Sequence, residues 1–263
     1  MDDVQILDVW GAGRRHPAAR PLLLLAAARP DLPARDLAAL PVGRRNLLLL
    51  RDRQATFGDR IDGDVTCPGC GERLELGLRL AELIAAPAVE SAPDALDGSE
   101  GSGGSGGSEG SEGSEGSEGS VVAGDVVLRF RLPTPADLQA ASSAPDPDAA
   151  AAVLLRRCVL SAVRGGQPVP VAELPGEVVD ALDTELGRHD PHADLRLATT
   201  CASCGHAFEL AVDPGELYWA ELAERAQRLL SEVHRLACAY GWTEGEILRL
   251  DPARREAYLE LVG

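Results

Sequence analysis

Two copies of a Cys-x-x-Cys-Gly motif are the feature of this sequence that most constrains its fold. They occupy residues 67–71 and 201–205, and 130 residues lie between Cys70 and Cys201. A glycine after the second cysteine permits the positive φ of a tight turn, which is the geometry of a zinc-ribbon knuckle. Each knuckle supplies two thiolates, whereas a closed tetrahedral zinc site needs four. We therefore predict one structural Zn²⁺ site, with the ligands Cys67, Cys70, Cys201 and Cys204.

The wide separation of the knuckles is compatible with a single site. Common zinc ribbons separate their knuckles by roughly 15 to 20 residues. The entropy cost of closing a loop nevertheless grows only slowly with its length. Two distant hairpins can therefore meet at one metal ion and hold the two halves of the chain together.

Three other interpretations of the knuckles remain open from the residues alone: two separate disulfides, a thioredoxin-like redox pair, or motifs that bind nothing. The chain opens with the acidic stretch MDDVQILDVW, unlike a signal peptide, so we expect a cytoplasmic protein whose thiols stay reduced. Redox pairs of this kind begin a helix after a strand. Both knuckles here lie between stretches that alternate like strands, which favours the metal site.

The remaining cysteines and histidines are expected to lie outside the metal site. His206 directly follows the second knuckle and is a rival ligand, but we favour its assignment as a hairpin-turn residue. Cys158 and Cys238 lie in apolar helical stretches and are expected to behave as small hydrophobic residues. The other histidines show no telling spacing to carboxylates or nucleophiles: His16, His189, His192 and His234.

Composition and periodicity divide the chain into six regions. Apolar residues alternate after the first knuckle, as in RLELGL, and this predicts a half-buried strand. Gly, Ser and Glu dominate a later segment, which predicts a disordered linker. The regions are N-terminal helices (1–60), the first knuckle arm (61–90), the linker (91–120), a strand plus helices (121–194), the second knuckle arm (195–213) and C-terminal helices (214–263). This order predicts an α+β fold, in which the two Cys-x-x-Cys hairpins form one small antiparallel zinc-ribbon-like sheet flanked by N- and C-terminal helices.

Several helix boundaries can be predicted from proline and capping residues. HPAARPLLLLAAARPDLP and RDLAALPVGRRNLLLLRDRQATFG each predict one buried helix, and DAAAAVLLRRCVLSAV and LPGEVVDALDTELGRHDP predict two more. VVLRFRLPTPADLQAA predicts a strand followed by a helix that starts near Pro135. Asp213 with Pro214, Thr243 with Glu246, and Asp251 with Pro252 each mark a helix start.

The composition and the missing motifs argue against several functional classes. A formal charge of −17 would repel nucleic acid. The apolar run PLLLLAAA is far shorter than the roughly 20 residues that span a membrane. The chain contains no Lys, which excludes a Gly-Lys-Ser/Thr phosphate loop, and we find no nucleophile elbow or His-Glu-x-x-His motif. Four thiolates would also leave zinc no open position for water. We expect no enzyme and no small-molecule substrate.

The order of motifs resembles that of a known family. LPVGRR and ATFG precede the first knuckle, RFRLPT follows the Glu-Gly-Ser insert, and HRLACAYGWTEGEILRLDPARREAYLELV ends the chain. Together they resemble the T-even-type phage baseplate protein family, whose members include baseplate hub assembly chaperones and relatives encoded with contractile injection systems. The resemblance implies an assembly role, baseplate hub or spike proteins as partners, and a place in a phage-tail-like particle.

Two alternative functions carry their own expectations. A zinc-ribbon adaptor for RNA polymerase or nucleic acid needs a basic face, and the knuckles offer only Arg73 and Arg196 beside several glutamates. A thiol redox protein would cycle one cysteine pair without zinc. The C-terminal aromatics suit an interface, but we expect Trp219, Tyr240 and Trp242 to belong to the core.

Overall fold

The computed structural model describes residues 1–85 and 117–262. The chain forms two compact units. Unit 1 comprises Met1–Ala38, Arg45–Ile84 and Leu195–Gly263, and unit 2 comprises Ala39–Arg44 and Ala85–Asp194. The fold therefore mixes helices with small antiparallel sheets, as the predicted α+β class requires.

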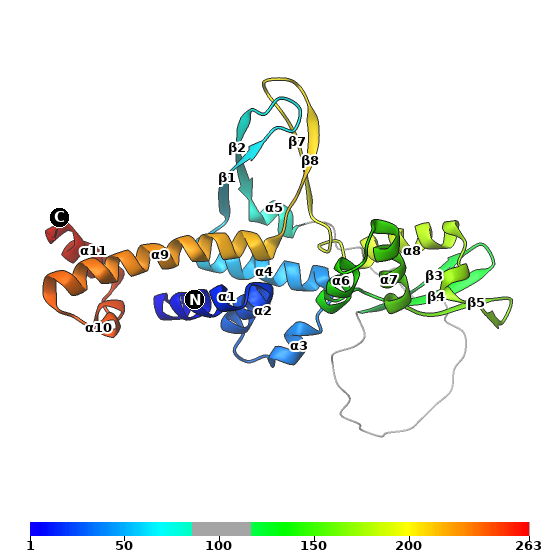
Figure 1. The fold of residues 1–263 in the computed structure, drawn as a ribbon, viewed down its shortest axis with the longest axis horizontal. Coiled ribbons are helices and arrows are strands. Elements are labelled where there is room, and N and C mark those ends of the chain that lie inside the picture. Colours follow the sequence, from blue (N-terminus) through cyan, green and yellow to red (C-terminus); the bar gives the residue numbers. More distant parts are fainter. Residues whose placement is uncertain (86–116, 263) are drawn as a thin grey trace, which may run out of the picture. The chain divides into compact units, whose positions relative to one another are not determined.

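The helices of unit 1 are built around the long C-terminal helix α9 (Figure 1). Pro21 lies in the first turn of α2, and Leu24 and Leu25 of the apolar run in that helix are fully buried. The LLLL run also lies in the core, because Leu49 and Leu50 are almost completely buried. The helices are α1 (Asp3–Arg15), α2 (Arg20–Ala28), α3 (Ala34–Ala38), α4 (Val42–Phe57), α5 (Leu80–Ile84), α9 (Pro214–Tyr240), α10 (Glu244–Leu248) and α11 (Pro252–Leu261), and a 3₁₀ turn covers Pro17–Ala19.

One predicted helix of this region is two helices. α3 ends at Ala38, and α4 begins at Val42, directly after Pro41. Proline disfavours helical geometry in the residue before it and cannot donate a backbone hydrogen bond. The segment that we expected to be continuous is therefore divided at Pro41.

The C-terminal helices begin where the capping residues predict. The Asp213 carboxylate accepts hydrogen bonds from the backbone N–H of Gly215 at 2.8 Å and of Glu216 at 3.2 Å. Gly241, with φ of +70°, ends α9, and Thr243 and Glu246 form a reciprocal capping box at the start of α10. No helix among the described residues is long and apolar enough to cross a membrane.

The three aromatic residues that we expected in the core differ in their burial. Trp219 is buried, as expected, and its ring occupies the space where Gly13 of α1 would carry a side chain. Tyr240 is 39% exposed, so its predicted place in the core is wrong. Tyr240 stacks on the half-buried Trp242 with ring centroids 4.7 Å apart, and both rings contact Tyr258 at the surface of the C-terminal segment.

Unit 2 contains a four-stranded antiparallel sheet in the order β3-β4-β5-β6. Every second residue of β4 is fully buried: Val126, Leu128 and Phe130. Val178 and Leu182 of α8 complete this core. The elements are β3 (Glu118–Ala123), β4 (Val126–Arg131), α6 (Pro135–Ser142), α7 (Pro147–Cys158), β5 (Val159–Arg164), β6 (Gln167–Pro168), a 3₁₀ turn (Val171–Glu173) and α8 (Gly176–His189).

The strand pairing of the described residues corrects three predictions. The stretch CVLSAV was expected to be helical, but α7 ends at Cys158 and Val159–Arg164 form β5. The linker was expected to reach Ser120, but β3 begins at Glu118; residues 91–116 of that prediction lie outside the described residues. The two knuckle hairpins do not form one sheet, since each is a separate two-stranded sheet.

The first turn of α4, which belongs to unit 2, is capped by a distant carboxylate. The side chain of Asp190 accepts a hydrogen bond of 2.7 Å from the backbone N–H of Gly43. A Cβ atom on Gly43 would collide with that carboxylate, so the LPVGRR stretch needs glycine at this position. Burial raises the pKa of Asp190, although the backbone hydrogen bonds from Gly43 and Arg44 oppose the shift.

Candidate metal centre

Each Cys-x-x-Cys motif forms the turn of a two-stranded hairpin in unit 1. β1 (Arg60–Thr66) pairs with β2 (Arg73–Arg79), and β7 (Arg196–Thr200) pairs with β8 (Ala207–Ala211). The last paired residues are Thr66 with Arg73 and Thr200 with Ala207, so both turns contain six residues. The two hairpins lie side by side in Figure 1, with their turns at the same end. The two motifs therefore occupy equivalent positions in equivalent hairpins.

The backbone hydrogen bonds of the two turns are the same. The N–H of Cys67 donates to the carbonyl of Glu72 at 2.8 Å, and the N–H of Gly71 donates to the carbonyl of Cys67 at 2.9 Å. In the second turn, Cys201 donates to His206 and Gly205 donates to Cys201, both at 2.9 Å.

The glycine of each knuckle is needed for its backbone conformation. Gly71 has φ of +78° and Gly205 has φ of +72°, and within the described residues only glycines adopt positive φ. A side chain in this left-handed region crowds the backbone, which costs about 1–2 kcal/mol. The predicted role of both glycines is confirmed.

The four cysteine sulfurs of the knuckles come together. Their Sγ atoms all lie within 4.8 Å of one another. The Cys67 and Cys204 sulfurs are 3.8 Å apart, and the Cys70 and Cys201 sulfurs are 3.7 Å apart. Four sulfurs at about 2.3 Å from one tetrahedral cation would be separated by about 3.8 Å. The distances therefore fit a four-thiolate metal site and are far longer than the roughly 2.05 Å of a disulfide.

The electrostatics of the cluster also suit a cation. The backbone N–H groups of Cys204 and Ser203 donate to the Cys201 sulfur and lower the pKa of that thiol to about 7. The backbone N–H of Glu72 acts in the same direction on Cys70, but the thiols of Cys204, Cys201 and Cys67 raise the pKa of Cys70 to about 12. One thiolate thus forms readily while another is suppressed by its neighbours. A divalent cation would remove this repulsion and favour four thiolates.

Two sets of contacts hold the base of the hairpins: a small apolar cluster and the hydrogen bonds of Arg53. Leu50, Ile61, Leu80 and Leu195 form a small buried cluster. Beside it, the buried guanidinium of Arg53 donates to the carbonyls of Gly58 at 2.6 Å and Arg60 at 2.8 Å. Arg53 also pairs with Glu221 of α9, with Nε 2.8 Å from the carboxylate. These contacts fix the direction in which the first hairpin leaves the helices.

The cluster has a buried and an exposed side. Cys67 and Cys201, the first cysteine of each knuckle, are each 1% exposed, whereas Cys70 and Cys204 are exposed. This is the only group of three or more potential metal-binding side chains among residues 1–85 and 117–262.

His206 lies beside the cluster but not in it. Its ring stacks on Phe208, with centroids 6.0 Å apart, and faces Gly69 of the opposite knuckle. A Cβ atom on Gly69 would lie 3.0 Å from the His206 ring. His206 is thus a turn residue, as predicted, and its ring also packs against the opposite knuckle at Gly69.

The remaining cysteines differ from each other. Cys158 is buried at the end of α7, as expected. Cys238 lies in a helix, as expected, but it is exposed on α9, so it does not pack as a small hydrophobic residue. Its sulfur lies 3.9 Å from the ring nitrogens of His234, one helical turn earlier. Sequence analysis missed this pair, although a spacing of four residues within a helical pattern places two side chains on one face.

Comparison with known proteins identifies one family. The family model described as T4 bacteriophage base plate protein matches residues 30–214, which is more than half of the chain and includes both knuckles. No curated protein and no solved structure matches the chain. The C-terminal stretch that follows residue 214 lies outside the matched range.

Proposed function

This chain belongs to the T4 bacteriophage base plate protein family, and from that premise we propose that it is a non-enzymatic assembly chaperone for the base plate hub. In this proposal it binds hub or spike proteins while a contractile tail, or a phage-tail-like injection system, is assembled. The family match over residues 30–214 is the observation that carries the proposal. A helical body with two projecting hairpins offers surfaces for protein partners, which an assembly factor requires.

The proposal includes a structural Zn²⁺ ion held by Cys67, Cys70, Cys201 and Cys204. When bound, zinc would supply a tetrahedral cross-link between the two hairpins. The chain's own residues prepare the geometry: Gly71 and Gly205 allow the turns, and the sulfur separations of 3.7 and 3.8 Å match those of a four-thiolate site. Four protein ligands leave no coordination position for a substrate or a reacting water, and this supports a non-enzymatic role.

The surroundings of the knuckles support a protein partner rather than nucleic acid. Arg73 pairs with Asp64, and Arg196 lies 3.7 Å from Glu209. Phosphate binding requires an excess of basic side chains. In the hairpins the arginines are paired with carboxylates, and the whole chain carries a formal charge of −17.

The arrangement of the thiols supports a metal role rather than a redox role. The Sγ–Sγ contacts of 3.7 and 3.8 Å run between the knuckles, whereas a redox Cys-x-x-Cys pair cycles within one motif. Both motifs also lie in hairpin turns instead of at a helix start. We therefore propose that the thiols serve as permanent ligands.

The proposed function can be tested in a cell that produces the tail particles. Deleting the gene for this chain should leave particles without a complete base plate, visible by electron microscopy. The wild-type gene should restore assembly, while Cys67→Ser should not. Mass spectrometry of purified particles would detect this chain if it were a permanent component. A chaperone predicts its presence in assembly intermediates and its absence from finished particles. Normal particles in the deletion strain would refute the assembly role.

A further inference from the structure

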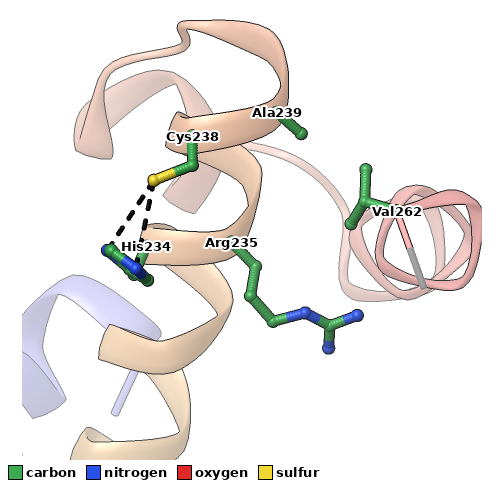
Figure 2. Close-up of a pocket in the computed structure, with 5 residues that line it drawn as sticks. All are labelled: His234, Arg235, Cys238, Ala239 and Val262. Carbon is green, nitrogen blue, oxygen red and sulfur yellow. Dashed lines mark hydrogen bonds between the residues drawn. The ribbon is translucent and has the colours of Figure 1, made fainter.

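His234 and Cys238 form a pair of metal-binding side chains that the four-cysteine centre does not use. Both are exposed and lie on adjacent turns of α9. The Cys238 sulfur is 3.9 Å from both Nδ1 and Nε2 of His234. Figure 2 shows the two side chains pointing to the same side of the helix.

The chemistry of this pair suits a divalent cation of the zinc class. Imidazole nitrogen and thiolate sulfur are the preferred protein ligands of Zn²⁺, at about 2.0–2.1 and 2.3 Å. A nitrogen and a sulfur bound to one tetrahedral ion at those distances lie about 3.6 Å apart. The observed 3.9 Å is close to that separation, and a small side-chain rotation would close the difference. No movement of the helix backbone is required.

The helix presents the pair on a stable support beside an open pocket. α9 is 27 residues long and is capped at both ends by Asp213 and Gly241. The pocket has a volume of about 380 Å³. Arg235 is held in its wall by a 2.9 Å hydrogen bond to the carbonyl of Leu259 in α11. The residues that line the pocket are His234, Arg235, Cys238, Ala239 and Val262.

From this geometry we propose that His234 and Cys238 form a second, exchangeable site for a thiophilic divalent cation. Two protein ligands leave two tetrahedral positions open, in contrast to the closed four-cysteine centre. Water or a ligand from another molecule occupies these positions. The site lies outside the range that matches the base plate family, and its argument does not depend on the assembly role.

Cobalt titration of the full chain tests this site. The protein is first purified with zinc in the four-cysteine centre, and Co²⁺ is then added. Comparable sites bind Co²⁺ more weakly than Zn²⁺, so the bound zinc remains in place. We expect one equivalent of Co²⁺ to bind, with the near-ultraviolet absorption of a cobalt–thiolate bond and no release of zinc.

Single substitutions identify the ligands. Cys238→Ser should abolish the cobalt–thiolate absorption, and His234→Asn should weaken Co²⁺ binding by about tenfold or more, because each removes one of two protein ligands. His16→Asn, at an exposed histidine elsewhere on the chain, should leave the titration unchanged. Both site residues are exposed, so circular dichroism should confirm unaltered folding. The proposal is overturned if the wild type binds no Co²⁺, or if a variant that carries both His234→Asn and Cys238→Ser binds it as tightly as the wild type.

Discussion

The hairpins of unit 1 and the sheet of unit 2 are stabilised in different ways. In β4 of unit 2, Val126, Leu128 and Phe130 alternate with exposed residues and are completely buried. In the four strands of the knuckle hairpins, Ile61 alone is buried. Isolated two-stranded hairpins are marginally stable in water, whereas a sheet of three or more strands with an apolar face is not.

The difference shows what the cysteines contribute. The sheet of unit 2 has a hydrophobic core, so it needs no cross-link. The hairpins of unit 1 bury too little apolar surface beyond their base, and the proposed metal centre connects them where a core is missing. Removing the metal ligands should therefore affect one region, and removing a core side chain should affect the other.

The largest expected effect is loss of the metal centre. Cys67→Ser removes a buried ligand, and we expect loss of zinc together with unfolding of β1, β2, β7 and β8. Zinc binding in small structural sites is worth on the order of 10 kcal/mol. Hydrogen exchange should show lost protection in these four strands and retained protection in β3, β4 and β5. Cys238→Ser is the matched control and should keep the zinc. If the hairpins remained protected in a zinc-free protein, the claim that the metal centre stabilises them would be contradicted.

A core substitution in unit 2 should destabilise the sheet of that unit and leave the knuckle hairpins and their zinc unaffected. Phe130 is completely buried, and its ring fills the space next to Gly119. Phe130→Ala should reduce the free energy of unfolding of unit 2 by about 3–5 kcal/mol, while the zinc content stays the same. Urea denaturation measures the loss in free energy of unfolding, and native-state hydrogen exchange shows whether the loss falls on unit 2. Val127→Ala, at a neighbouring position that is 47% exposed, should change stability by less than about 0.5 kcal/mol. Zinc loss in Phe130→Ala would show that the two regions depend on each other.

The polar support of unit 2 predicts a smaller, pH-dependent effect. The buried Asp137 carboxylate accepts hydrogen bonds from Arg131 at 2.6 and 2.9 Å and from Arg157 at 2.6 Å. The Arg131 guanidinium holds the pKa of Asp137 well below its ordinary value. This stabilisation is present above the unfolded pKa, about 3.9, and is lost as the pH falls toward the folded value. Asp137→Asn should cost about 2 kcal/mol at pH 7.

Denaturation curves at several pH values test whether the stabilisation by Asp137 is lost as the pH falls. The stability difference between wild type and Asp137→Asn should be constant near neutrality and should narrow below about pH 4. Asp125→Asn provides the control, because Asp125 pairs with Arg164 at the surface and its side chain is 71% exposed. A gap that widens in acid would show that Asp137 is not the ionised partner of the two arginines.

The smallest effect tests whether the two knuckles are equivalent. Gly71→Ala and Gly205→Ala should each cost about 1–2 kcal/mol because both positions have positive φ. If this conformational strain is present only in the metal-bound form, zinc affinity should decrease by about tenfold. Gly63→Ala in β1 is the control, since its φ is not left-handed and no atom lies within 4 Å of the added Cβ. A competition assay with a zinc chelator measures the three variants. Unequal losses at Gly71 and Gly205 would mean that the knuckles are not equivalent.

The candidate site could be predicted because metal chemistry restricts the residues at fixed offsets. Cys67, Cys70 and Gly71 recur as Cys201, Cys204 and Gly205, and nothing else in the chain has this pattern. The C-terminal helices were predictable for a similar reason: Asp213 before Pro214 is a local signal that needs no tertiary information.

Features that depend on distant contacts could not be predicted. CVLSAV continues the apolar helical run of α7, and a short apolar run does not distinguish a helix from a buried strand. Glu118–Ser120 share the composition of the linker, and only pairing with β4 makes them a strand. Likewise, alternation along each hairpin could not show that the hairpins form separate sheets.

Zinc analysis combined with a solution mass is the most direct test of the central claim. The purified chain should contain one zinc per molecule, bound by the four cysteines whose sulfurs lie within 4.8 Å of one another. With that zinc content, a monomeric mass in solution would show that all four cysteines of the site belong to one chain. Elemental analysis and light scattering provide the two numbers. A zinc-free protein with four titratable knuckle thiols would contradict the metal centre.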